Sequence, residues 1–92
     1  ATDKDLIKVT DLFPNPASIK TSLTMVAKRN VTAQVEIYSM DGSLVQQVFD
    51  GALIEALPTT LEIDVNGLES GLYHLRVSSK NFVTTKKLLV IE

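Results

Sequence analysis

The sequence lacks cysteine and tryptophan and contains a single histidine, His74. Without cysteine, the chain can form neither a disulfide nor a thiolate zinc site. One histidine cannot complete an imidazole ligand set, and no serine or threonine has a recognisable partner base for nucleophilic catalysis. Asp3, Asp5 and Asp11 do not have EF-hand spacing, which leaves open only a loose surface calcium site. We therefore expect no enzyme activity and no cofactor.

Two further absences narrow the functional class. No apolar run is long enough to cross a membrane, and a net charge of −2 is too small for a protein that binds nucleic acid. The first residues, ATDKDLIKV, lack the basic start and apolar run of a signal peptide. With 92 residues, 45% of them hydrophobic, the chain has the size and composition of one globular domain. We expect this domain to be part of a longer protein, such as its tail.

Along much of the sequence, hydrophobic and polar residues alternate with a period of two. Leu61, Ile63 and Val65 alternate with Glu62 and Asp64, and similar alternation recurs along most of the chain. This pattern is typical of strands with one buried face. Strands are expected at residues 6–13, 19–26, 31–40, 43–49, 60–65, 72–78 and 82–91. The sequence thus predicts an all-β fold, an immunoglobulin-like antiparallel β-sandwich of about seven strands.

Turn residues separate these segments. Asp41 and Gly42 both tolerate a positive φ and stand between two apolar segments, which predicts a hairpin. Pro14 and Pro16, on either side of Asn15, cannot both sit in a hydrogen-bonded ladder. This proline segment is therefore expected to break the first apolar segment from the next.

A second local motif supports the sandwich. The stretch LESGLYHLRV places Leu68, Gly71 and Tyr73 as L-x-x-G-x-Y at the start of a strand. This spacing resembles a tyrosine corner, in which a tyrosine hydroxyl donates a hydrogen bond to the backbone just upstream. We expect Gly71 to adopt a conformation that a Cβ would penalise. The motif is structural and implies no activity.

Charges are segregated along the second half of the chain. Residues 41–69 contain acidic residues but no lysine or arginine, whereas the charged residues of 74–92 are mostly basic. We favour the interpretation that two neighbouring strands carry complementary cross-strand pairs. A basic recognition edge near the end of the chain is the alternative.

The sequence closes on KKLLVIE, two lysines followed by four aliphatic residues and a glutamate. In a strand, Leu88 and Val90 point to one face and Leu89 and Ile91 to the other. We expect this last strand at a sheet edge, where a partner could add a strand. If only one face packs on the core, the other pair is available to a receptor or to a second copy in a homodimer. The alternative is that all four side chains are core.

Small sandwiches often bind sugars by stacking them on exposed aromatic rings. Only Tyr38 is expected on a polar face, because Tyr73 belongs to the corner and Phe13, Phe49 and Phe82 are interpreted as core. An accessory module that binds glycans, or that packs on a neighbouring catalytic domain, is therefore the weaker alternative function.

Three stretches in this order carry a family resemblance: LFPNPAS, VEIYSMDGSLVQQ, and IDVNGLESGLYHLRV with the later KKLLV. Together they resemble the C-terminal sorting domain of the type IX (Por) secretion system of Bacteroidetes. The resemblance covers the chain from about Leu12 to its end. Ile91 and Glu92 extend past the usual lysine-led run.

The resemblance implies a non-catalytic signal that directs an N-terminal cargo domain through the type IX outer-membrane translocon. It also implies passage through the periplasm, arrival at the outer-membrane surface or outside the cell, and in most cases removal by a sortase-like peptidase. Residues 6–92 would be the sorting domain and residues 1–5 a linker or cleavage region. Translocon recognition is assigned by the resemblance to Lys86, Lys87, Leu88, Leu89 and Val90. The structural motif positions are Pro14, Asn15, Pro16, Asp41, Gly42, Leu68, Gly71 and Tyr73.

Overall fold

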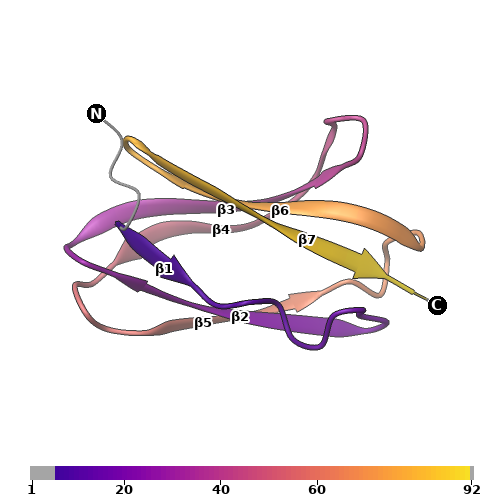
Figure 1. Ribbon diagram of the computed structural model, residues 1–92, viewed down its shortest axis with the longest axis horizontal. Coiled ribbons are helices and arrows are strands. Elements are labelled where there is room, and N and C mark those ends of the chain that lie inside the picture. The colour runs from indigo at the N-terminus through magenta and orange to yellow at the C-terminus, as the bar shows by residue number, and fades with distance from the viewer. Residues whose placement is uncertain (1–5, 92) are drawn as a thin grey trace.

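The computed structural model describes residues 6–91, which form seven strands in two sheets (Figure 1). No helix occurs within these residues. The strands are β1 (Ile7–Val9), β2 (Lys20–Ala27), β3 (Val31–Ser39), β4 (Leu44–Leu53), β5 (Thr59–Asp64), β6 (Gly71–Ser79) and β7 (Phe82–Val90). The predicted all-β sandwich of seven strands is confirmed. The linker or cleavage region expected at residues 1–5 lies outside the described residues, as does Glu92.

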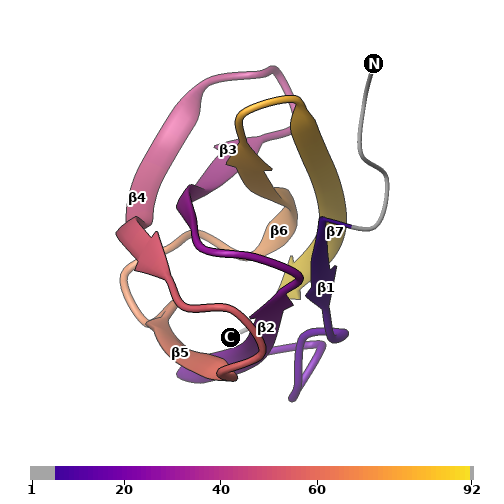
Figure 2. The ribbon, with the colours of Figure 1, turned by 90° about the vertical axis from the view of Figure 1, so that its left-hand side faces the viewer.

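The two sheets face each other across one core (Figure 2). One sheet has the strand order β1-β2-β5 and the other β4-β3-β6-β7, with every neighbouring pair antiparallel. Inward side chains of both sheets are buried, for example Met25 and Ile63 in one sheet and Val35 and Leu75 in the other. The last strand, β7, lies at a sheet edge as expected.

The first strand is shorter than predicted, and Phe13 does not lie in the core. β1 ends at Val9, Leu12 is buried, and the Phe13 side chain is 77% exposed. The N–H and C=O of Phe13 both bond to the backbone of Ser22 (3.0 and 2.9 Å), forming an isolated bridge to β2. Because successive side chains point to opposite faces, burial of Leu12 turns Phe13 outward. The core prediction holds for Phe82, which is buried, whereas Phe49 is partly buried against the core.

The tyrosine corner is present as predicted. The Tyr73 hydroxyl donates a hydrogen bond of 2.6 Å to the C=O of Glu69, and the ring is buried. Gly71 has a φ of +153°, which side chains rarely adopt, although no atom lies where its Cβ would be. The glycine is therefore required by backbone conformation and not by space. Leu68 packs against the core beside this corner.

Candidate functional site: one end of the sandwich

The sequence motifs lie far apart in the chain but meet at one end of the long axis, on the right in Figure 1. Across β6 and β7, Gly71 pairs with Val90 and Tyr73 pairs with Leu88. Ala17, just after the proline segment, forms a parallel bridge with Val90. We call this end of the molecule the motif end. β1 begins at the opposite end of the sandwich, on the left in Figure 1.

The side chain of Asn15 pairs with the edge of β7 as a backbone peptide group would. Its Nδ2 donates to the C=O of Lys87 (2.9 Å), and its Oδ1 accepts from the N–H of Leu89 (3.0 Å). A carboxamide has the same donor and acceptor groups as a peptide bond, so it can replace one residue of a neighbouring strand. Asn15 thus supplies the N–H donor that Pro14 and Pro16, which lack an N–H, could not supply.

Ala17 extends this pairing through its backbone. Its N–H donates to the C=O of Leu89 (2.8 Å), and its C=O accepts from the N–H of Ile91 (2.8 Å). The edge of the terminal run is therefore already occupied by the chain itself. The expectation of an open edge is wrong for this part of β7, because residues 15–17 take its outward-facing groups. We call residues 15–17 and their bonds to β7 the proline clasp.

The two residues just before the proline clasp anchor it on β2. The Thr21 hydroxyl, a buried polar group, donates to the C=O of Pro14 (2.8 Å). The Ser22 hydroxyl donates to the C=O of Phe13 (3.1 Å). Because β2 belongs to one sheet and β7 to the other, this segment ties the two sheets together at the motif end. Sequence reasoning missed the roles of Ala17 and Thr21, because Ala17 bonds through its backbone and Thr21 lies outside the quoted motifs.

Alternate residues of the terminal run have opposite environments. Leu88 and Val90 are 0% and 2% exposed and belong to the core, whereas Leu89 and Ile91 are 38% and 44% exposed. The reading in which all four are core is wrong. Ile91 also lines a hollow at the motif end, whose other walls are Ser18, Ile19, Asn66 and Leu68.

The two lysines of the run also differ. The Lys86 ammonium lies 3.2 Å from the Asp11 carboxylate, and 30% of its side chain is exposed. Lys87 is exposed and lies opposite His74 on the outer face of the sheet. Lys86 thus links β7 to the segment before the proline clasp through an ion pair, whereas the charge of Lys87 is exposed to solvent.

The segregated charges do not pair across neighbouring strands in the way we favoured. Strand β5, with Glu62, neighbours β2 and neither β6 nor β7. Glu62 instead bonds to Lys20 of β2 (2.9 Å), and this contact raises the pKa of Lys20. Since Lys86 bonds to Asp11, neither pair joins the acidic stretch to the basic one.

The hairpin predicted at Asp41 and Gly42 is present next to the motif end. Ser39, which ends β3, pairs with Tyr73, and Gly42 has a φ of +92°. The Asp41 carboxylate accepts hydrogen bonds from the Ser39 hydroxyl and from the N–H of Ser43 (3.0 Å). These donors, Ser39 first, hold the pKa of Asp41 below its ordinary value because they favour the charged form.

Tyr38, the expected sugar-stacking residue, is engaged on the outer face of the sheet. Its hydroxyl donates to the Glu36 carboxylate (2.9 Å), a bond that raises the pKa of Tyr38. The Arg76 guanidinium carbon lies 5.5 Å from the centre of its ring. Arginine at that distance makes a cation–π contact and covers one ring face.

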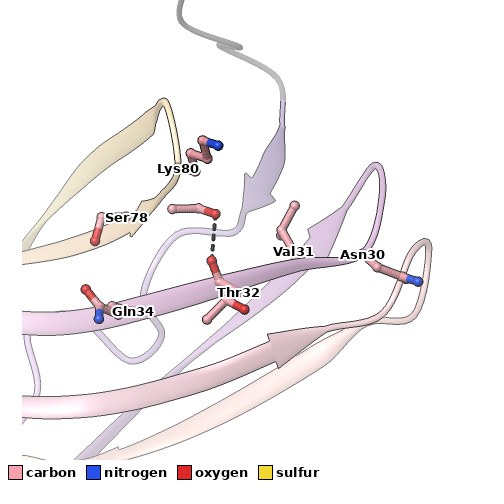
Figure 3. Close-up of a pocket in the computed structure, with 7 residues that line it drawn as sticks. Asn30, Val31, Thr32, Gln34, Ser78 and Lys80 are labelled. Atoms are coloured by element: carbon pink, nitrogen blue, oxygen red, sulfur yellow. Dashed lines mark hydrogen bonds between the residues drawn. The ribbon is translucent and has the colours of Figure 1, made fainter.

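A hollow with mostly polar residues in its walls lies at the opposite end of the sandwich (Figure 3). It is formed by β3 and the turn between β6 and β7, and its walls are Asn30, Val31, Thr32, Gln34, Ser78, Ser79 and Lys80. Inside it, the Ser79 hydroxyl donates to the C=O of Thr32 (2.6 Å). None of the positions assigned by the family resemblance lies in this hollow, and its walls contain no histidine, aspartate or glutamate.

Residues 6–91 hold no group of three or more histidine, cysteine or acidic side chains that could bind a metal ion. Of the aspartates weighed for calcium, Asp11 bonds to Lys86, and Asp3 and Asp5 lie outside the described residues. Within the same residues, no helix has the length and apolar character needed to cross a membrane.

Comparison with solved structures supports the immunoglobulin-like class. The chain is similar to the CARDB domain of a Pyrococcus furiosus protein that was crystallised in complex with di-metal ions, with a TM-score of 0.59. The match covers 99% of this chain and 94% of that chain, at 13% sequence identity. At this identity the likeness concerns the fold alone. No curated protein is significantly similar in sequence.

Comparison with protein-family models gives a more specific result than the likeness in fold. The family model of the secretion system C-terminal sorting domain matches residues 11–92. The chain therefore belongs to this family of C-terminal sorting signals of type IX secretion, and membership implies export to the cell surface or the extracellular space. The resemblance recognised from the sequence motifs is confirmed.

Proposed function

We propose that the type IX outer-membrane translocon recognises this domain at its motif end, and that the domain has no catalytic role. The observation that carries the proposal is the convergence of the motifs. The proline segment, the tyrosine corner and the terminal run are separate in sequence but bonded or paired to one another in the fold. A receptor could therefore read them as one surface, and only in the folded domain.

In this proposal, the cargo and the cleavage region lie at the end of the sandwich opposite the motif end. β1 begins there, and residues 1–5 would join the domain to its cargo. The sandwich extends 38 Å along its longest axis. A sortase-like peptidase acting before Leu6 could then work while the translocon holds the motif end. The domain would pass through the periplasm before its cargo reaches the surface or the medium.

The accessory-module alternative has less support. Tyr38 is the ring on which a sugar would stack, and Arg76 and Glu36 already contact it. A homodimer through the terminal run also lacks support, because residues 15–17 occupy that edge.

The order of a fusion tests the proposal. A fluorescent reporter behind a signal peptide is joined either before residue 1 or after residue 92, and surface and medium fluorescence are measured in a Bacteroidetes strain with an intact type IX system. We expect export only when the reporter precedes the domain, because a reporter placed after residue 92 crowds the motif end. Thermal unfolding of both fusions checks that the domain is folded. Equal export in both orders would contradict a C-terminal signal.

A further inference from the structure

The outer face of the four-stranded sheet is apolar at the motif end. On β7, Leu89 points outward and lies opposite Leu72 of β6. Their side chains are 38% and 37% exposed. Met40, which is 60% exposed, stands one position beyond the pair of Ser39 and Tyr73 that joins β3 to β6. We define Met40, Leu72 and Leu89 as the outer patch.

Cationic side chains border the outer patch. In the adjacent row, Lys87 is exposed and lies opposite His74. One row further, Arg76 stands over Tyr38. In these two rows of β3, β6 and β7, Glu36 is the only carboxylate among the described residues, and it accepts the Tyr38 hydroxyl. Toward the middle of the sheet the border is therefore positive overall, whereas the exposed Asp41 carboxylate follows Met40 on the side of the hairpin.

Much of the rest of the terminal run is not accessible to a partner. Leu88 and Val90 are buried in the core. The outward backbone groups of Leu89 and Ile91 are bonded to the proline clasp, so a partner strand could not pair there without displacing it. The exposed side chains of Lys87, Leu89 and Ile91 are what remains for recognition, and Ile91 lines the hollow at the motif end.

Resting on the proposed function, we infer that the outer patch is the contact surface for the receptor of the secretion machinery. The partner that fits is a protein surface with an apolar centre and carboxylates at its rim, since such a surface complements both Leu72 with Leu89 and the charge of Lys87. Leu72, which stands between Gly71 and Tyr73, thereby gains a role in recognition. Gly71 and Tyr73 set the conformation of the corner, and this conformation places the Leu72 side chain on the outer face of the sheet.

The test compares five variants of the 92-residue chain, each fused behind a reporter and a signal peptide; one is a double substitution, and the fifth, Ile19→Ser, changes the hollow beside Ile91. Leu72→Ser with Leu89→Ser removes the centre of the patch. Val83→Ser is the matched control, because Val83 is an exposed apolar residue of β7 on the same face but toward the opposite end. Lys87→Glu and Lys80→Glu form a second matched pair, since Lys80 is exposed in the turn before β7. Export of each is measured in an intact strain and in a translocon-deficient sibling, and thermal unfolding of each domain is measured in parallel.

We expect the patch variant and Lys87→Glu to lose about tenfold or more of translocon-dependent export, as for truncation of a central contact. Val83→Ser and Lys80→Glu should export as the unchanged domain does, and all variants should stay folded. If the double variant at Leu72 and Leu89 and the Lys87→Glu variant are both exported as well as the unchanged domain, this inference is overturned and the proposed function stays intact. Loss in Ile19→Ser, with the patch variants unaffected, would move recognition to the hollow beside Ile91 and also overturn it. If the unchanged domain itself is not exported, the proposed function fails instead.

Discussion

At the scale of residues, strand alternation divides the terminal run between folding and recognition. Leu88 faces Tyr73 inside the sandwich and is fully buried, whereas Leu89 faces Leu72 outside. Side chains one position apart in the sequence thus meet entirely different surroundings. Their contributions to the free energy of unfolding should differ accordingly.

This difference can be measured with one pair of alanine substitutions. Leu88→Ala should lower the free energy of unfolding by about 2–5 kcal/mol, because it removes buried contacts and leaves a cavity. Leu89→Ala should lower it by about 1 kcal/mol or less, the size of a cross-strand pair on an exposed face. Chemical denaturation of the isolated chain measures both. Similar losses for the two variants would show that Leu89 is also a core residue.

Residue-level sequence reasoning succeeded where a local rule decides the outcome. The Tyr73 hydroxyl and the Gly71 conformation follow from spacing within one short stretch, and both are confirmed. Phe13 was misplaced because its orientation depends on a bridge to Ser22, which the local sequence does not specify. The alternation of Leu88 and Leu89 was predictable, but which of them faces the core depends on how β7 sits in the sheet.

At the scale of elements, the proline clasp protects a strand edge that would otherwise be open. An unpaired strand edge is a template for aggregation, and proteins commonly cover it. Here the cover is a side-chain amide, Asn15, together with the backbone of Ala17. The N–H of Lys87 and the outward groups of Val83 and Thr85 keep no hydrogen-bond partner among the described residues.

Amide hydrogen exchange tests this arrangement. The amides of Leu89 and Ile91 should exchange slowly and those of Val83 and Thr85 quickly. In Asn15→Ala, exchange at Leu89 should speed up roughly tenfold, the effect of losing one hydrogen bond.

Ile91 serves as the internal control in the same variant, because its amide donates to Ala17 and not to Asn15. Unchanged protection at Ile91 would show that the loss is local. An Asn15→Ala variant in which Leu89 keeps full protection would refute the bond between this side chain and the strand.

The clasp could not be predicted from sequence, because its partners are far apart. Asn15 and its acceptor at Lys87 are 72 positions apart, and Lys86 and Asp11 are 75 apart. Local rules identified the prolines as a break between strands. They do not indicate which strand a side chain between the prolines will contact.

At the scale of the whole molecule, the class of fold was largely predictable from the sequence, whereas the pairing of the strands was not. Period-two alternation gave the number of strands because each strand buries one face. The order of strands was not predicted, and the interpretation of the charges failed for that reason. It assumed that acidic and basic stretches were neighbours, whereas the topology places Glu62 beside Lys20.

The same topology makes folding and sorting inseparable in some experiments. Deleting residues 88–92 removes two core residues together with the exposed ones, so lost export after deletion would not distinguish misfolding from lost recognition. Single substitutions on the outer face avoid this difficulty, because they leave the core intact.

The central claim, that this chain is a type IX sorting signal, is tested most directly by one export measurement. Residues 1–92 are fused behind a signal peptide and a fluorescent reporter in a Bacteroidetes strain with an intact type IX system and in a translocon-deficient sibling. We predict that the reporter reaches the surface or the medium only in the intact strain. A reporter that stays in the periplasm of both strains, attached to a folded domain, would contradict the account.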